Sequence, residues 1–152
     1  SAMVAFAEMT EALRREDLTV LDQLEVLYRR YGLHSTAQRS LLLEPGASAG
    51  IINRQLRASS PRSVAGRAVE SVLDLLAETD SGFPESDVLV YRLEGGARIV
   101  IRPSGTEPKI KCYYEVREEI APSRSFTEAE RSAHASLDRL IVVHQKELSS
   151  FI

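Results

Sequence analysis

The chain of 152 residues has no tryptophan, a single cysteine (Cys112) and no apolar run that approaches 20 residues. One cysteine excludes an internal disulfide framework and a cysteine-rich metal site. The lack of a long apolar run excludes a helix that spans a bilayer. No signal peptide is recognisable, so we expect a cytoplasmic protein without a membrane partner.

The chain also lacks a large excess of charge of either sign. Nineteen Lys and Arg residues stand against 22 Asp and Glu residues, which gives a formal net charge of −3. So slight an acidic excess provides no global attraction to nucleic acid, and the few aromatic residues do not alternate with basic ones. We therefore expect no nucleic-acid partner. The 43% hydrophobic and 27% charged residues are typical of one globular core with an appendage.

Common catalytic and metal-binding patterns are missing as well. His34, His134 and His144 lie too far apart in sequence for a helical metal pair, and no acidic residues accompany them at ligand spacing. The sequence shows no Ser-His-Asp arrangement and no P-loop. His144 falls on an apolar helical stripe, which favours a core or interface histidine over a ligand. We expect neither a metal site nor a catalytic residue in this chain.

Hydrophobic periodicity predicts the elements and their order. The second helix begins at a Thr19 cap, ends at Gly32 and carries an apolar stripe that we expect to be buried (Val20, Leu24, Leu27, Tyr28 and Tyr31). The final helix begins at one of two capping-box frames, Ser125 or Thr127. The expected elements are helices over 4–15, 19–32, 47–56 and 125–148, and strands over 34–44, 63–76, 87–93, 97–102 and 109–116. The segment over 63–76 favours a strand, but Ala65, Gly66 and Ala68 leave a helix as the alternative. This order favours an α+β fold in which helices cover one face of an antiparallel sheet.

The most informative segment is the polar turn between the strands over 97–102 and 109–116. Arg102, Ser104 and Thr106 gather hydrogen-bond donors within five residues. The planar arginine fork matches phosphate oxygens two at a time. Gly105 has no Cβ, so backbone N–H groups can approach a ligand closely. The turn therefore predicts a cradle for phosphate or carboxylate, and an ordinary hairpin turn remains the alternative.

Charged residues beyond the turn extend this interpretation. Lys109 and Lys111 share one face of the following strand, and Lys111 is the better candidate for a second positive charge at the ligand. Glu107 could orient Arg102 or contact sugar hydroxyls. The alternative is that all three are solvated surface residues. Cys112 alternates with these lysines, so we expect it to be buried on the covered face.

The ten residues from Arg102 to Lys111, RPSGTEPKIK, resemble the phosphate-binding loop of the C-terminal domain of the α-D-phosphohexomutases, the phosphoglucomutase/phosphomannomutase family. The resemblance implies a four-stranded, mainly antiparallel sheet packed against two helices and preceded by a short helical segment of the previous domain. It also implies a phosphate site made by Arg102, Ser104, Gly105, Thr106 and Lys111, with Glu107 and Lys109 as weaker candidates.

The same resemblance implies an activity for the parent protein. The full enzyme would be an isomerase that interconverts hexose 1-phosphate and hexose 6-phosphate through a phosphoserine and a bisphosphorylated sugar. It would need Mg²⁺ and a hexose bisphosphate activator. The family's serine loop, aspartate-rich magnesium loop and sugar-reading loop belong to other domains, and none of these motifs occurs in this sequence. We therefore expect this chain alone to bind no cofactor and to be inactive.

The resemblance also suggests a division of the chain. Residues 1–3 look like an expression-tag remnant, 4–33 like the helical tail of the preceding mutase domain, and 34–152 like the C-terminal phosphate-binding domain. The expected partners are a phosphosugar substrate and the N-terminal domains of the same enzyme. The alternative is a stand-alone, non-catalytic phosphosugar-binding or scaffold module.

Overall fold

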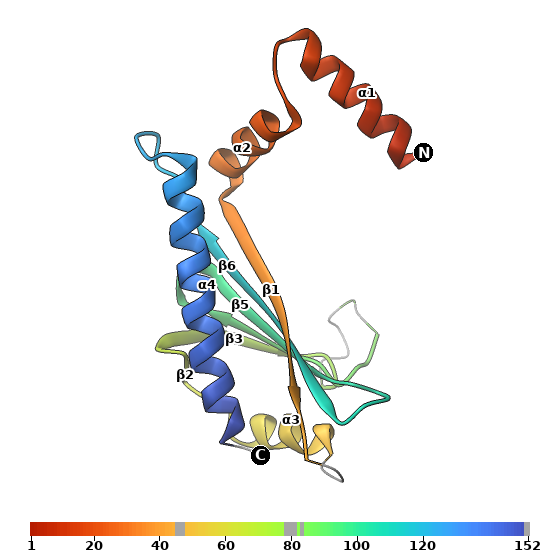
Figure 1. The fold of residues 1–152 in the computed structure, drawn as a ribbon. Coiled ribbons are helices and arrows are strands. Elements are labelled where there is room, and N and C mark those ends of the chain that lie inside the picture. Colours follow the sequence, from red (N-terminus) through yellow and green to blue (C-terminus); the bar gives the residue numbers. More distant parts are fainter. Residues whose placement is uncertain (45–47, 78–81, 83, 151–152) are drawn as a thin grey trace.

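The computed structural model describes residues 1–44, 48–77, 82 and 84–150. The chain forms an elongated α+β body with two helices projecting from one end (Figure 1). The helices are α1 (Ala2–Arg15), α2 (Val20–Tyr31), α3 (Ala49–Ala58) and α4 (Phe126–Ser149). The strands are β1 (Leu33–Leu42), β2 (Ser63–Val64), β3 (Arg67–Asp74), β4 (Leu89–Leu93), β5 (Ala97–Pro103) and β6 (Lys109–Glu118).

The sheet has six strands in the order β1-β6-β5-β4-β3-β2, and every neighbouring pair is antiparallel. The predicted α+β class is confirmed, but the four strands that the resemblance implies are too few, as are the five that periodicity predicts. One reason is the segment over 63–76, which folds as two strands instead of one. Ala65 and Gly66 break it with positive φ angles of 51° and 75°, forming a tight turn.

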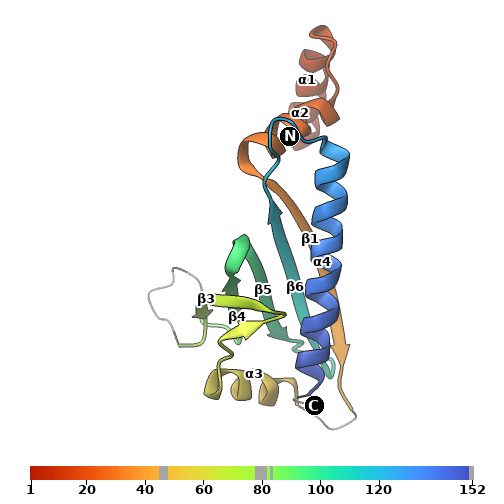
Figure 2. The ribbon, with the colours of Figure 1, turned by 90° about the vertical axis from the view of Figure 1, so that its left-hand side faces the viewer.

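One face of the sheet is covered by helices and the other is open. The long helix α4 crosses β1 and β6, and α3 packs below β5 (Figure 2). Side chains alternate along each strand, so every second residue enters the core. The covered face of β4, β5 and β6 carries fully buried side chains, among them Leu89, Leu93, Ile99, Ile101 and Ile110. Burial of each contributes about 1.5–3 kcal/mol. The open face carries charged and polar side chains together with the half-buried Val90, Val100 and Tyr113.

Helix α4 begins at the first of the two predicted frames. The Ser125 hydroxyl accepts a hydrogen bond from the Glu128 N–H at 3.3 Å, and the Glu128 carboxylate accepts one from the Ser125 N–H at 3.4 Å. Thr127 lies inside the helix. The buried stripe comprises Ala129, Ala133, Leu137, Leu140, Ile141, His144 and Leu148. His144 therefore lies on a buried apolar stripe of this helix, as predicted.

Helix α3 is tied to the sheet by an ion-pair cluster. Arg57 donates to both carboxylate oxygens of Asp74 on β3, at 2.8 and 3.0 Å, and to Asp87 at 2.6 Å. The hydrogen bond from Arg57 holds the pKa of Asp74 below its usual range. Asn53 on the same helix also donates to Asp87, at 3.0 Å. This cluster fixes the lower end of the sheet, where the turn between β5 and β6 is found.

Helices α1 and α2 stand apart from the sheet (Figures 1 and 2). The Thr19 cap and its acidic partner Asp22 are confirmed as a capping box. The expected burial of the α2 stripe is wrong for this chain, since Leu24 and Tyr31 are 37% and 56% exposed. Tyr28 makes the main contact by stacking on Phe126, with ring centroids 5.8 Å apart. The stripe is apolar, as its pattern indicated, but the described part of the chain supplies no second layer to cover it.

Gly32 ends α2 as predicted. Its φ is 94°, and a Cβ at this position would come within 2.6 Å of the Arg117 Nε. Arg117 in turn donates to the Tyr31 carbonyl at 3.1 Å. Glycine therefore permits both the backbone conformation and the close approach of an arginine that anchors the end of α2 to β6. No helix in the described part of the chain is long and apolar enough to cross a membrane.

Candidate phosphate-binding site

The turn that connects β5 to β6 is held at its base by backbone hydrogen bonds. The Ser104 N–H donates to the Lys109 carbonyl at 2.9 Å, and the Lys109 N–H donates to the Glu107 carbonyl at 2.7 Å. A third bond runs from the Leu43 N–H to the Pro108 carbonyl at 2.9 Å, and it ties the turn to the end of β1. These bonds brace the turn against the sheet.

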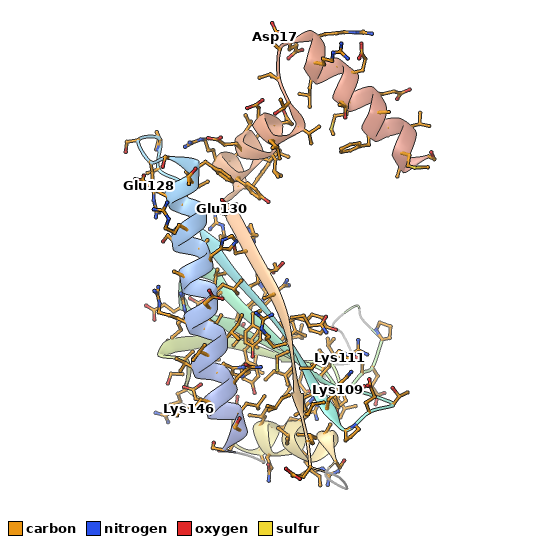
Figure 3. The ribbon with its side chains drawn as sticks, in the orientation of Figure 1. Asp17, Lys109, Lys111, Glu128, Glu130 and Lys146 are labelled. Atoms are coloured by element: carbon orange, nitrogen blue, oxygen red, sulfur yellow. The ribbon has the colours of Figure 1, made fainter. Side chains whose placement is uncertain are left out.

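Two cations lie at the mouth of this turn. Arg102 on β5 is the register partner of Lys111 on β6. The covered face of these strands holds Ile101, Ile110 and Cys112, so Arg102 and Lys111 occupy the open face. Figure 3 shows Lys111 near the turn, on the side of the sheet away from α4. Like charges placed directly opposite each other in a sheet repel.

Neither of these two cations forms an ion pair within residues 1–44, 48–77, 82 and 84–150. An anion bound between them would relieve their repulsion. Such an anion would receive the planar fork of an arginine and the point charge of a lysine. The pair is therefore suited to a small, doubly charged ligand such as a phosphate group.

Gly105 leaves space at the tip of the turn. A Cβ built at this position meets no atom within 4 Å, and its φ is not in the left-handed region. Neither backbone conformation nor packing therefore requires glycine here. Ser104 is half-buried, while Gly105 and Thr106 are exposed. The space lies where a ligand would approach the backbone, as the sequence interpretation of Gly105 expects.

Glu107 and Lys109, the two weaker candidates for contact with a phosphate, form an ion pair with each other. The Lys109 ammonium lies 2.6 Å from the Glu107 carboxylate, and the side chains are 19% and 56% exposed, respectively. The hydrogen bond and the charge of Lys109, with the charge of Lys111, hold the pKa of Glu107 below its usual range. The charge of Lys109 is thus largely met by Glu107, which leaves Arg102 and Lys111 as the cations available to an anion.

On the covered face, the prediction that Cys112 is buried is confirmed: its exposed fraction is 1%. Burial raises the pKa of the Cys112 thiol to about 11. The next inward residue, Tyr114, shares a 2.9 Å hydrogen bond with His144 of α4. Burial lowers the pKa of His144 to about 4, so the imidazole is neutral at pH 7. His144 is a core residue, as its position on the apolar stripe indicated.

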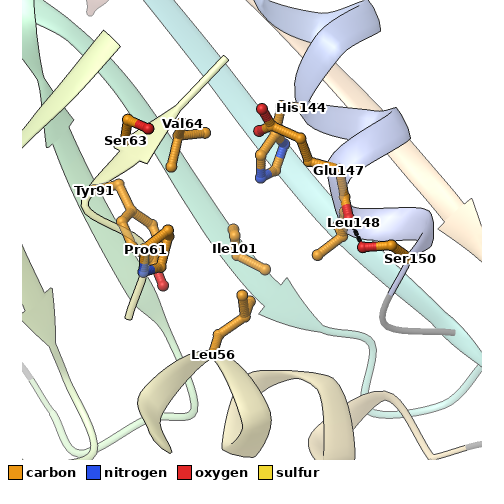
Figure 4. Close-up of a pocket in the computed structure, with 10 residues that line it drawn as sticks. All are labelled: Leu56, Pro61, Ser63, Val64, Tyr91, Ile101, His144, Glu147, Leu148 and Ser150. Atoms are coloured by element: carbon orange, nitrogen blue, oxygen red, sulfur yellow. Dashed lines mark hydrogen bonds between the residues drawn. The ribbon is translucent and has the colours of Figure 1, made fainter. Parts of the chain in front are cut away.

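An apolar pocket of about 280 Å³ also lies on the covered face (Figure 4). Its lining includes the apolar side chains of Leu56, Val64, Ile101 and Leu148, together with His144. This pocket is separated from Arg102 and Lys111 by the sheet itself. Its mainly apolar lining is unsuited to a phosphate, so the candidate site is the turn and not this pocket.

No donor set for a metal ion is found in the part of the chain that the structure describes, because no three His, Cys, Asp or Glu side chains come together there. A magnesium site made by this chain therefore does not fit the described residues, and we assign no step of a reaction to a metal held here.

Sequence reasoning missed the contribution of β1. Its residues Gln38 and Ser40 are register partners of Tyr113 and Lys111 on β6, so they adjoin the candidate site on the open face. The pairs are 75 and 71 positions apart along the chain. A local pattern carries no signal for so distant a pairing. Only the sheet topology reveals it.

Comparison with known proteins agrees with the family resemblance of the segment from Arg102 to Lys111. Residues 52–124 match the family model described as phosphoglucomutase/phosphomannomutase, C-terminal domain. Over 117 residues the chain is 33% identical to a probable phosphomannomutase from Haemophilus influenzae, covering 77% of this chain and 23% of that protein. It is 31% identical over 131 residues to the human glucose 1,6-bisphosphate synthase, covering 76% and 21% of the two chains.

A solved structure shares the fold. The phosphoglucomutase pp63/parafusin from Paramecium, in an open form, matches with a TM-score of 0.55 at 16% identity, over 88% of this chain and 23% of that one. This fold and the family-model match together indicate a sugar-phosphate mutase domain. The chain belongs to the phosphoglucomutase/phosphomannomutase family and carries its C-terminal domain. It spans about a quarter or less of the length of these relatives.

Proposed function

We propose that this chain is the phosphate-clamping domain of an isomerase that interconverts hexose 1-phosphate and hexose 6-phosphate. The observation that carries the proposal is the pair of cations, Arg102 and Lys111, placed in register beside the open backbone of Gly105. The family supports a phosphosugar as the ligand. The division into a helical tail over 4–33 and a phosphate-binding domain over 34–152 is part of this proposal.

In this account, Arg102, Ser104, Gly105, Thr106 and Lys111 hold the phosphate that is not being transferred. Arg102 donates two hydrogen bonds to phosphate oxygens, and the Ser104 and Thr106 hydroxyls and the Gly105 N–H donate further ones. Binding energy from this distant phosphate positions the reacting end of the sugar. The nucleophilic serine, the magnesium ligands and the bisphosphate activator act in other domains of the parent.

The proposal gives the domain a second task, which is closure. A domain that grips the far phosphate draws the substrate into a cleft shared with the preceding domains. Closure excludes water, which would otherwise hydrolyse the phosphoserine. The braced turn suits this task, because a rigid clamp transmits the movement of the whole domain to the ligand.

The test is a kinetic comparison in the complete enzyme, with this chain's numbering kept. Arg102→Ala removes two charge-assisted hydrogen bonds, each worth roughly 1.5–3 kcal/mol, so kcat/KM for the hexose phosphate should fall by about 10²- to 10⁴-fold. The control is Arg139→Ala, the same change at an exposed position of α4. A loss of less than threefold at Arg102, or an equal loss at Arg139, would rule out the clamp.

A further inference from the structure

The covered-face pocket of about 280 Å³ combines a mainly apolar inner wall with a polar rim. The inner wall consists of buried side chains, each no more than 5% exposed: Leu56, Val64, Tyr91, Ile101, His144 and Leu148. Exposed residues form the rim: Ser63, Glu147 and Ser150. An apolar cavity of about 150 Å³ is large enough to bind benzene. This pocket therefore has room for an aromatic ring with a short chain attached.

Glu147 places a carboxylate at the rim of this pocket. The Ala65 N–H donates to the carboxylate, whose two oxygens lie at 3.2 and 3.0 Å from the nitrogen. In Figure 4 the carboxylate lies beside His144, at the end of the pocket opposite to Leu56. Among the described residues, no cation forms an ion pair with Glu147. A carboxylate has about four acceptor positions, so this one can still accept hydrogen bonds from a ligand.

The charge of the lining determines which ligands suit the pocket. His144 is neutral at pH 7, because burial lowers its pKa to about 4. Glu147 is therefore the only charged side chain among the described residues of the lining. An anionic ligand would be repelled by this carboxylate, and a neutral apolar ligand would leave it without a partner. A ligand with an apolar body and a cationic head would use both parts of the pocket.

We propose that the covered-face pocket binds a small arylalkylamine, with its ring against the inner wall and its ammonium group on Glu147. The ring would contact Leu56, Val64 and Leu148, where burial of apolar surface supplies most of the affinity. The ammonium group would donate to the carboxylate at the rim and remain partly hydrated there.

This site is distinct from the turn between β5 and β6. The Ile101 side chain lines the pocket, whereas the next residue, Arg102, faces the open side of the sheet. An amine in the pocket and a phosphate at the turn would therefore lie on opposite faces of the sheet and would not compete. The proposal does not depend on the proposed function, and the two can be tested separately.

The experiment is an NMR titration of the ¹⁵N-labelled chain at pH 7 with three probes that share a phenyl ring and a short chain. Phenethylamine carries a cationic head, phenethyl alcohol a neutral one and phenylacetate an anionic one. We expect dissociation constants on the order of millimolar for the amine. The amine should bind about two- to fivefold more tightly than the alcohol, and phenylacetate should bind most weakly. The amide signals of Val64, Ala65 and Leu148 should shift, while those of Gly105 and Thr106 should not.

Two variants test the two parts of the pocket. Glu147→Gln removes the charge but keeps an oxygen that can accept from the Ala65 N–H, so the fold should persist and the amine should lose its advantage over the alcohol. Val64→Phe fills the pocket and should weaken the amine and the alcohol alike, by about tenfold. Glu8→Gln is the matched control for charge, at an exposed position of α1 at the other end of the molecule (Figure 1). It should keep the preference for the amine.

Three results would overturn the proposal. The first is that the unmodified chain binds no phenethylamine, or binds it no more tightly than the alcohol. The second is a preference for the amine that survives Glu147→Gln, which would assign the cation to another carboxylate. The third is that the amine shifts Gly105 and Thr106 and leaves Val64 and Ala65 unmoved. Since inorganic phosphate is read out at Gly105 and Thr106, failure of the phosphate site would leave these results unaffected.

Discussion

Arg102 lies directly opposite Lys111 across the β5–β6 ladder, and both side chains are on the face of the sheet that no helix covers. Two like charges in this relationship oppose folding slightly unless an anion joins them. The nearby carboxylate of Glu107 pairs with Lys109 instead. The positive charges of Arg102 and Lys111 therefore stay available beside a turn whose backbone is already hydrogen-bonded. A preorganised site of this kind is suited to binding and releasing a phosphate group.

Gly105→Ala should separate ligand binding from stability. A Cβ at this position meets no protein atom within 4 Å, so the midpoint of thermal unfolding should stay within a few degrees of the original. The methyl group would occupy the approach to the backbone N–H groups, so phosphate affinity should fall. Gly66→Ala is the matched control. Its φ of 75° makes the variant strained, by about 1 kcal/mol or more, without any effect on phosphate affinity. Unchanged phosphate affinity in Gly105→Ala would mean that the ligand does not approach this backbone.

Glu107→Gln should distinguish two roles for this carboxylate. Its charge lies beside the cationic turn, so its removal should tighten the binding of inorganic phosphate by about twofold. The same change should weaken glucose 6-phosphate if Glu107 accepts hydrogen bonds from sugar hydroxyls. Parallel isothermal titrations with the two ligands give the answer. Weaker binding of inorganic phosphate would show that Glu107 orients the site and does not merely lower its charge.

Much of the site could be predicted from sequence because it is local. The strands over 97–102 and 109–116 alternate clearly, and a short polar turn joins them, so proximity of Arg102 and Lys111 follows from one hairpin. The role of β1 could not be predicted in this way. Gln38 reaches Tyr113 only through a pairing of distant segments, and alternation within a strand does not identify its neighbour.

Two predictions about the fold were wrong, and the physical reasons differ. The break at Ala65 and Gly66 depends on a positive φ at both residues. Gly66 was a signal for a turn, but the positive φ of Ala65, which is not glycine, was not predictable from its type. The stripe of α2 was correctly predicted to be apolar. Periodicity identifies the apolar face of a helix, but it does not show whether the residues that cover this face belong to the same chain. Leu24 and Leu27 are exposed here for that reason.

His144 should make the stability of the chain depend on pH. Its pKa falls from 6.5 in the unfolded chain to about 4 in the folded one, because burial disfavours the charged imidazole. The unfolded chain therefore binds more protons between these values. The contribution of His144 to the free energy of unfolding should be constant above about pH 6.5 and should decrease as the pH falls toward 4, by at most about 3 kcal/mol. Urea titrations at several pH values measure this, and His144→Gln should flatten the profile over that interval. A His144→Gln profile as steep as that of the original chain would assign the dependence to other groups.

The most direct test of the central claim is a titration of the ¹⁵N-labelled chain with inorganic phosphate, followed by NMR. Two or three charge-assisted hydrogen bonds, less the cost of immobilising the ligand, predict a dissociation constant on the order of millimolar. The amide signals of Gly105 and Thr106 should shift and saturate. Arg102→Ala should abolish these shifts without unfolding the chain, and Arg139→Ala should leave them unchanged. If the two amides do not move, or if Arg102→Ala moves them as the original chain does, the turn is not a phosphate site.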